Sequence, residues 1–189
     1  DGYGINLLPL ATFALSVYAD TDCSCFRLKE TSKGEFALAS DLEMRMYKAI
    51  TMLQFKLEGQ IICANPDFAM DAHLLLDKID YTNKTITLKD CDFPTISPEA
   101  PYEFTKEEKE LVYMLRKAFM NSEKLQKHTK LFFTKGAMYR VCNNNLLFHG
   151  CVPLNEDGTF THISVGGDAL YGRALFNRLE KQARAAFYA

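Results

Sequence analysis

One histidine has surroundings that suit metal binding or catalysis. Residues 143–151 read NNNLLFHGC, so His149 ends an apolar run and Gly150 follows it directly. A strand that buries residues 146–148 would hold the imidazole rigidly at its exposed end, and the glycine would let backbone or a ligand come close. A metal site and an ordinary strand end are both consistent with this pattern.

The other histidines and the cysteines form no recognisable metal motif. His73, His128 and His162 are not spaced for joint metal binding. The six cysteines include one Cys-x-Cys pair, Cys23 and Cys25, but no second pair at zinc spacing. Because no secretory signal is visible, the cysteines are predicted to be reduced thiols of a cytoplasmic protein.

Composition and motifs argue against several functional classes. The formal net charge is −2, and Lys and Arg are interspersed with Glu and Asp, so the basic surface typical of nucleic-acid binding is missing. The most apolar run, residues 5–18, contains Pro9 and is shorter than the roughly 20 residues that span a bilayer. Nucleic acid and membrane are therefore not expected partners. Glycine-rich nucleotide motifs, HExxH and a nucleophile elbow do not occur.

Helical periodicity dominates the elements that must position His149. Ser40 with Glu43, and Thr105 with Glu108, have the spacing of capping boxes, which predicts two helix starts. The first of these helices is expected to end near residue 65, and Pro66 to begin another that continues through residue 78. Helices are predicted to begin near residues 5, 40, 66, 105, 121 and 172.

Alternating apolar residues predict short hairpins. Residues 79–88 alternate on both sides of a TNK turn, and residues 136–154 alternate around a run of asparagines, which tolerate positive φ. Residues 161–165 read as a further short strand. The predicted fold class is therefore α+β, predominantly helical with short antiparallel hairpins, with helix near half of the residues rather than the usual third.

Four long stretches carry a resemblance to a known enzyme family. Residues 1–18, 41–62, 74–81 and 121–160 closely resemble the class III fructose-1,6-bisphosphatases of bacteria. The resemblance implies a calcineurin-like α/β metallophosphoesterase with a helical insertion. It also implies hydrolysis of the 1-phosphate of fructose 1,6-bisphosphate to fructose 6-phosphate and phosphate, a step of gluconeogenesis. Since the family's proteins are much longer, this chain is expected to be an internal fragment.

The resemblance further implies a two-metal site that uses Mn²⁺, with His149 as one metal ligand. Two divalent ions polarise phosphate oxygens and lower the pKa of a bridging water, which then attacks phosphorus. The family's Gly-Asp-x-x-Asp-Arg and Gly-Asn-His ligand blocks do not occur in this chain. The chain alone is therefore expected to be inactive, and no catalytic residue is assigned.

The same resemblance suggests how the chain is divided. Residues 1–20 would be a helix of the catalytic core, residues 21–134 a mainly helical insertion or cap, and residues 135–189 a core hairpin with a closing helix. A bisphosphate substrate also needs cationic side chains that hold its phosphates. The candidates, none of them singled out by the sequence, are Lys124, Lys127, Lys135 and Arg140.

A non-catalytic function remains the alternative. In that case the chain is a helical scaffold or an oligomerisation module, and His149 is a structural strand-end residue. If the chain is part of an enzyme, its partners are fructose 1,6-bisphosphate and the remainder of the catalytic domain. Surfaces that this remainder covers would then be exposed at Phe148, Val152 and the last helix, with a homo-oligomer as a possible result.

Overall fold

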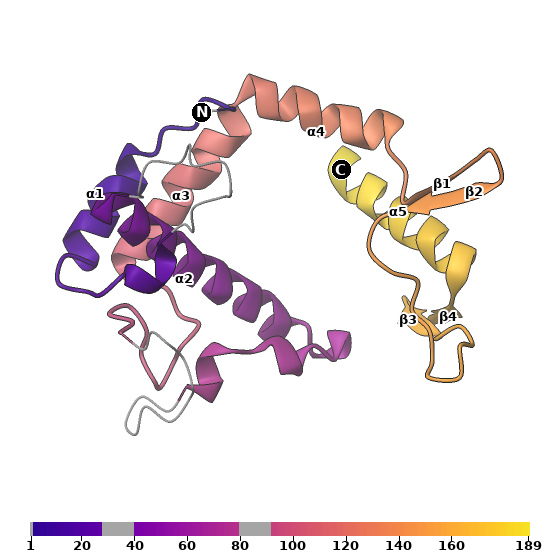
Figure 1. Ribbon diagram of the computed structural model, residues 1–189, viewed down its shortest axis with the longest axis horizontal. Coiled ribbons are helices and arrows are strands. Elements are labelled where there is room, and N and C mark those ends of the chain that lie inside the picture. Colours follow the sequence, from indigo (N-terminus) through magenta and orange to yellow (C-terminus); the bar gives the residue numbers. More distant parts are fainter. Residues whose placement is uncertain (1, 28–39, 80–91) are drawn as a thin grey trace. The chain divides into compact units, whose positions relative to one another are not determined.

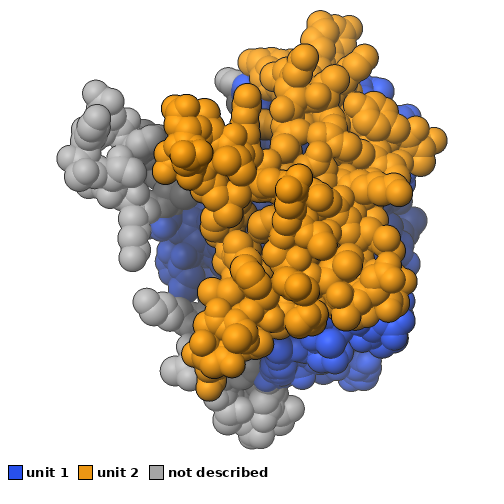
Figure 2. All heavy atoms as spheres, turned by 90° about the vertical axis from the view of Figure 1, so that its right-hand side faces the viewer, with its two compact units in different colours: residues 1–122 blue, residues 123–189 orange. Residues whose placement is uncertain are grey.

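The computed structural model describes residues 2–27, 40–79 and 92–189. The chain forms two compact units, residues 1–122 and residues 123–189, which are coloured blue and orange in Figure 2. Helices make up 56% of the described residues, and the strands form two short antiparallel hairpins (Figure 1). The predominantly helical α+β class predicted from the sequence is confirmed.

The core of the first unit forms where α1 (Leu8–Val17) packs against α2 (Asp41–Ala64) and α3 (Lys106–Asn121). Pro9 lies in the first turn of α1, where proline needs no hydrogen-bond partner for its nitrogen. The helix carries no charged residue, and Leu10, Phe13 and Ala14 are buried in the core. The helix predicted from the apolar run is therefore confirmed, with its start at Leu8.

The second helix, α2 (Asp41–Ala64), begins with the predicted capping box. The Ser40 hydroxyl accepts a hydrogen bond from the Glu43 backbone N–H at 3.2 Å, and the Glu43 carboxylate accepts one from the Ser40 N–H at 2.7 Å. These two bonds satisfy donors that a helix start otherwise leaves open. The helix ends at Ala64, directly before the Asn65-Pro66 pair, as predicted.

The chain after α2 differs from the prediction. Instead of one helix from Pro66, it forms three short 3₁₀ helices: η2 (Pro66–Phe68), η3 (Asp71–His73) and η4 (Leu76–Lys78). Ala69 adopts a left-handed conformation with φ of +50°, which interrupts the helical path. The single-helix prediction was wrong because local apolar spacing does not report this break. The hairpin predicted for residues 79–88 lies outside the described residues beyond Ile79.

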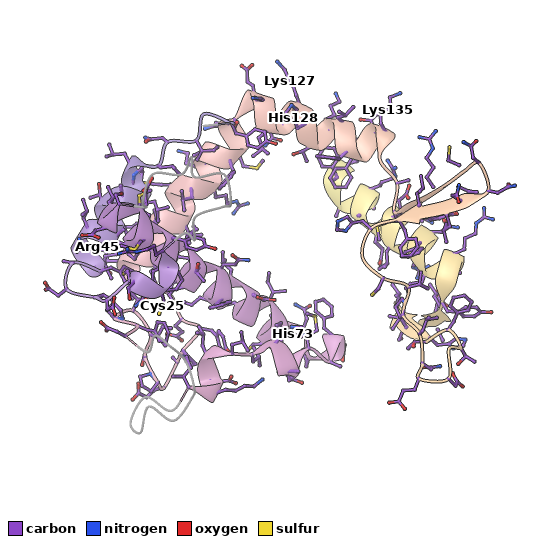
Figure 3. The ribbon with its side chains drawn as sticks, in the orientation of Figure 1. Cys25, Arg45, His73, Lys127, His128 and Lys135 are labelled. Atoms are coloured by element: carbon purple, nitrogen blue, oxygen red, sulfur yellow. The ribbon has the colours of Figure 1, made fainter. Side chains whose placement is uncertain are left out.

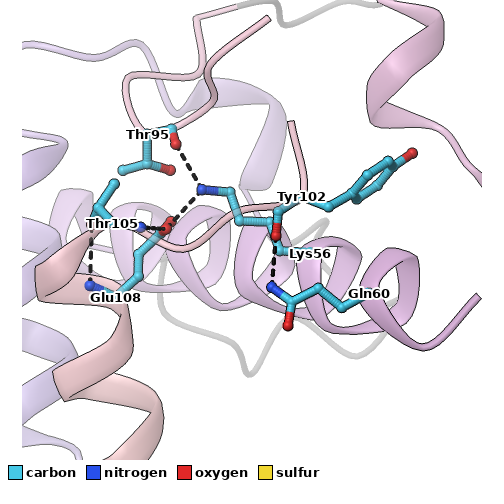
Figure 4. A network of polar contacts seen from close by, with 6 residues as sticks. All are labelled: Lys56, Gln60, Thr95, Tyr102, Thr105 and Glu108. Atoms are coloured by element: carbon cyan, nitrogen blue, oxygen red, sulfur yellow. Dashed lines mark hydrogen bonds and ion pairs between the residues drawn. The ribbon is translucent and has the colours of Figure 1, made fainter. Parts of the chain in front are cut away.

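The third helix, α3 (Lys106–Asn121), starts with the second predicted capping box at Thr105, and one of its residues also forms a buried ion pair. The Lys56 ammonium lies 2.7 Å from the Glu108 carboxylate, with 0% and 1% of the two side chains exposed (Figure 4). The same ammonium donates to the Thr95 carbonyl at 2.6 Å. This network joins α2 to the start of α3 and to the segment before it.

Tyr102 makes a second connection within the first unit. Its hydroxyl accepts a hydrogen bond from the Leu76 backbone N–H at 3.1 Å and donates to the Asp77 carboxylate at 3.2 Å. Its ring lies so close to α2 that a Cβ on Gly59 would stand 2.1 Å from a ring carbon. Burial is the main reason that the pKa of the Tyr102 hydroxyl is raised above 10.0.

The second unit contains both hairpins between two helices. Helix α4 (Glu123–Lys135) is followed by β1 (Tyr139–Cys142) and β2 (Asn145–Phe148), then by β3 (Ile163–Val165), β4 (Asp168–Leu170) and α5 (Gly172–Tyr188). Asn143 and Asn144 turn the first hairpin with φ of +49° and +61°, the conformation that a two-residue hairpin turn requires. The asparagine turn predicted from the sequence is therefore confirmed.

Helix α5 holds the second unit together. Its Phe176 packs against Tyr139 and Phe148 of the first hairpin, with ring centroids 6.0 and 6.2 Å apart, and its Arg178 pairs with Asp168 of the second hairpin at 3.1 Å. A closer ring contact joins the C-terminal part of α5 to α4. Phe187 of α5 stacks on Phe133 of α4 with ring centroids 4.2 Å apart. Leu175 and Phe176 are the buried apolar residues of this unit's described part, so its core is small.

Glu180 of α5 gives the second unit a predicted dependence on pH. Its carboxylate accepts a hydrogen bond from the Met138 backbone N–H at 2.9 Å and another from the Arg184 guanidinium at 3.0 Å. The Met138 bond, followed by Arg184, lowers the pKa of this carboxyl below its ordinary value of 4.5. A lowered folded-state pKa contributes stability above pH 4.5, and that stability is lost as pH falls through the folded-state pKa.

We therefore expect the Glu180→Gln chain to lose thermal stability at pH 7 and to show a smaller drop in melting temperature between pH 7 and about pH 3. Circular dichroism melts at both pH values measure this drop. Glu156→Gln, at an exposed glutamate of the same unit, should leave the drop unchanged. An equal drop in the wild-type and Glu180→Gln chains would contradict the assigned contribution.

Candidate functional site

His149 is the first residue after β2, and its side chain is exposed. Gly150, which follows it, has a φ of +88°, and a Cβ placed there would meet no atom within 4 Å. The chain therefore turns sharply beside the imidazole and leaves open space around the turn. This agrees with the prediction that His149 stands at an accessible strand end.

The strand that leads to His149 is not buried, contrary to the sequence prediction. The exposed fractions of Leu146, Leu147 and Phe148 are 52%, 54% and 42%. The prediction was wrong because an apolar run is buried only where other elements cover both faces of its strand, and α5 covers one face of this hairpin. The expected exposure of Phe148 is present, whereas Val152 is half-buried and α5 buries Leu175.

The two faces of the first hairpin differ in what they contact. Tyr139 lies opposite Phe148 in the register, and both rings pack against Phe176 of α5. Arg140 lies opposite Leu147 in the next pair, so alternation along the strands directs these two side chains to the other face. Both are exposed. The hairpin thus presents a guanidinium on its open face, near the end from which His149 emerges.

The described residues do not complete a metal site around His149. Within residues 2–27, 40–79 and 92–189, no group of three or more His, Cys, Asp or Glu side chains is placed to hold a metal ion. One imidazole is too few for a two-ion centre, because ions such as Mn²⁺ also require carboxylate or other oxygen ligands. These residues therefore supply one candidate ligand and not a metal centre.

The other histidines belong to different elements from His149. His73 belongs to η3 of the first unit and His128 to α4, and both are exposed (Figure 3). His162 precedes β3 and contacts the Tyr171 ring, with centroids 4.6 Å apart. Cys63, Cys142 and Cys151 are free thiols, as predicted, and Cys91 lies outside the described residues.

The basic residues proposed for phosphate binding lie on two elements of the second unit. Lys124, Lys127 and Lys135 are exposed on α4, where Lys127 pairs with Glu123 at 3.7 Å (Figure 3). Arg140 lies on β1. Residues 123–189 contain nine Lys and Arg but five Asp and Glu, a formal charge of +4 within a chain of −2. The unit that carries His149 is therefore the basic part of an acidic chain.

Four hollows in the described part of the surface have linings that do not include His149. A hollow of about 430 Å³ between α1 and α3 is mostly apolar, with Leu8, Phe13 and Met114 in its lining. Another, of about 200 Å³, lies beside α5 and is lined by residues that include Phe133 and Ala183. Neither includes the imidazole, so the candidate site is an open surface. No helix in the described part of the chain is long and apolar enough to cross a membrane.

Sequence comparisons identify what this arrangement is similar to. The relative from Clostridium novyi, a class 3 fructose-1,6-bisphosphatase, is 49% identical over 195 aligned positions, which cover 100% of this chain and 29% of the relative. Relatives of the same name from Alkaliphilus metalliredigens and Bacteroides fragilis are 48% and 46% identical, again over 100% of this chain and 30% of theirs. No solved structure matches significantly.

The chain thus spans about 30% of the length of the curated relatives that it matches. The model of the family described as Firmicute fructose-1,6-bisphosphatase matches residues 1–189, which is the whole sequence. A match of this extent cannot come from one shared motif, because it includes both compact units. The chain belongs to the Firmicute fructose-1,6-bisphosphatase family.

Proposed function

We propose that the family-length protein carrying this chain hydrolyses the 1-phosphate of fructose 1,6-bisphosphate. Water is consumed, and fructose 6-phosphate and inorganic phosphate are released, as a step of gluconeogenesis in the bacterial cytoplasm. The observation that carries the proposal is the family match over all 189 residues. The exposed imidazole on the basic unit supports it, because a phosphate ester needs cationic groups and metal ligands at the reacting phosphate.

His149 is assigned as one ligand of a Mn²⁺ site in that protein. An imidazole at an exposed strand end is accessible to a metal, and Gly150 leaves room beside it. The described residues offer no group of three ligands, so the carboxylates and further imidazoles of this site would be supplied by other parts of the family-length protein. Residues 1–20 and 135–189 then belong to the catalytic core, and residues 21–134 form its helical insertion or cap.

The exposed apolar side chains fit the same proposal. Phe132, Val141 and Leu147 are 72%, 63% and 54% exposed, and the second unit buries too few apolar residues to gain much stability alone. We infer that the remainder of the catalytic domain covers this surface. The alternative is that a second copy of the chain covers these side chains. The second unit would then be an oligomerisation module.

The decisive experiment is phosphate release from fructose 1,6-bisphosphate, with and without Mn²⁺. The isolated chain should release none above background because its metal site is incomplete, whereas the family-length protein should show Mn²⁺-dependent release. Release without any effect of metal addition or chelation would contradict the Mn²⁺ assignment. A family-length protein without activity, together with a concentration-dependent dimer of the isolated chain, would favour the oligomerisation module instead.

A further inference from the structure

Two of the four arginines of the second unit, Arg140 and Arg173, have no structural role among the described residues. The guanidinium of Arg178 pairs with Asp168 at 3.1 Å, and that of Arg184 bonds Glu180 at 2.9 Å and the Gly136 carbonyl at 2.6 Å. Arg140 makes no ion pair and no hydrogen bond with any other residue that the structure describes, and its side chain is exposed. The Arg140 side chain therefore neither connects two elements nor neutralises a carboxylate.

The hairpin fixes where this guanidinium can reach. Tyr139 and Phe148 pack against Phe176, which anchors their face of the hairpin against α5. Arg140 is therefore directed to the opposite, open face, next to its register partner Leu147. The Tyr139–Phe148 pair, which packs against α5, directly precedes the Arg140–Leu147 pair in the hairpin. The hairpin therefore fixes the backbone of Arg140 and leaves its side chain exposed.

His149 follows the last paired residue of β2 and stands two residues beyond Leu147, the partner of Arg140. If the register continued by one residue, the two would be diagonal neighbours, which are roughly 7–8 Å apart in an antiparallel pair. A phosphate group fits between two side chains at that spacing, since guanidinium binds phosphate oxygens in a bidentate manner. The lysines of α4 lack this relation, because they lie on a different element from His149.

We propose that Arg140 binds the phosphoryl group that is hydrolysed, directly beside the metal ligand His149. The proposal rests on the proposed function, and it names a substrate-binding residue for the same site. The ligand class is a sugar phosphate whose reacting phosphate is held by the guanidinium through two oxygens. The sequence alone left Arg140 and three lysines as equal candidates for phosphate binding. The proposal selects Arg140 from these four.

The test uses the family-length protein with Mn²⁺ and measures KM for fructose 1,6-bisphosphate together with the inhibition constant of inorganic phosphate, the product. Arg140→Gln should raise both constants roughly 10- to 100-fold, as expected for the loss of a charge-assisted contact. Arg140→Lys should give a smaller increase, because the charge stays and the bidentate geometry is lost. Bound Mn²⁺ and the thermal midpoint should remain those of the wild type.

Arg173→Gln is the matched control, because Arg173 is also exposed and lies on α5 rather than on the hairpin. It should leave both constants unchanged. An active Arg140→Gln protein with wild-type KM and wild-type inhibition by phosphate overturns the proposal and leaves the phosphatase intact. Loss of bound metal in Arg140→Gln also overturns it, because Arg140 would then support the metal site. If the wild-type protein does not hydrolyse the substrate, the proposed function fails and this proposal fails with it.

Discussion

Lys56→Met should lower the free energy of unfolding of the chain by roughly 3–5 kcal/mol, the cost of leaving one member of a buried ion pair without its partner. The Glu108 carboxylate is 1% exposed, and one of its oxygens has no hydrogen-bond partner among the described residues. After the substitution its remaining hydrogen bond among the described residues is from the Thr105 backbone N–H at 2.8 Å. Water cannot replace the ammonium without opening the contact between α2 and α3.

A second substitution separates the charge from the packing. Glu108→Gln keeps an acceptor for the Thr105 N–H, because glutamine also serves at this position of a capping box. The Lys56→Met/Glu108→Gln chain should therefore be more stable than the Lys56→Met chain, although it lacks the ion pair. Urea unfolding followed by far-UV circular dichroism measures these differences, since the chain has no tryptophan to report them.

Lys127→Met is the control for the same chemical change on a helix surface. Its ammonium is 78% exposed and pairs with Glu123 at 3.7 Å, so the change should stay within about 0.5 kcal/mol. If Lys56→Met were equally mild, the burial of the pair described for α2 and α3 would be wrong.

The features that the sequence predicted correctly depend on residues close together in the chain. The Ser40 and Thr105 capping boxes each join residues three apart, and the asparagine turn joins adjacent residues, so the pattern contains every partner. The buried ion pair could not be predicted in this way. Lys56 lies 39 residues from Thr95 and 52 from Glu108, and in the sequence it is one more lysine on a helix.

The candidate site was predicted only in part for the same reason. The position of His149 at an exposed strand end follows from the local pattern NNNLLFHGC, and the structure agrees. The burial of residues 146–148 depends on which elements cover the hairpin, which a local pattern does not contain. The choice among the basic residues required the strand register, because the register places Arg140 on the open face. The ligand role of His149 stays a prediction.

That role predicts the largest functional effect. In the family-length protein, His149→Ala should lower Mn²⁺-dependent phosphate release by at least roughly 100-fold, because even residues that only orient metal ligands contribute 10- to 100-fold. The loss should be accompanied by weaker Mn²⁺ binding, and raising the Mn²⁺ concentration should recover part of the activity. The fold should be unaffected, since the side chain is exposed and its removal leaves no cavity.

His128→Ala provides the matched control, because it removes an exposed imidazole from α4 of the same unit. Its activity and bound Mn²⁺ should equal those of the wild type. Three outcomes then separate the roles of His149. Loss of metal with loss of activity supports the ligand role, whereas loss of activity with full metal content would make His149 a substrate-binding or proton-transferring group. Unchanged activity would make it a strand-end residue, and the metal ligands of this family would all lie elsewhere.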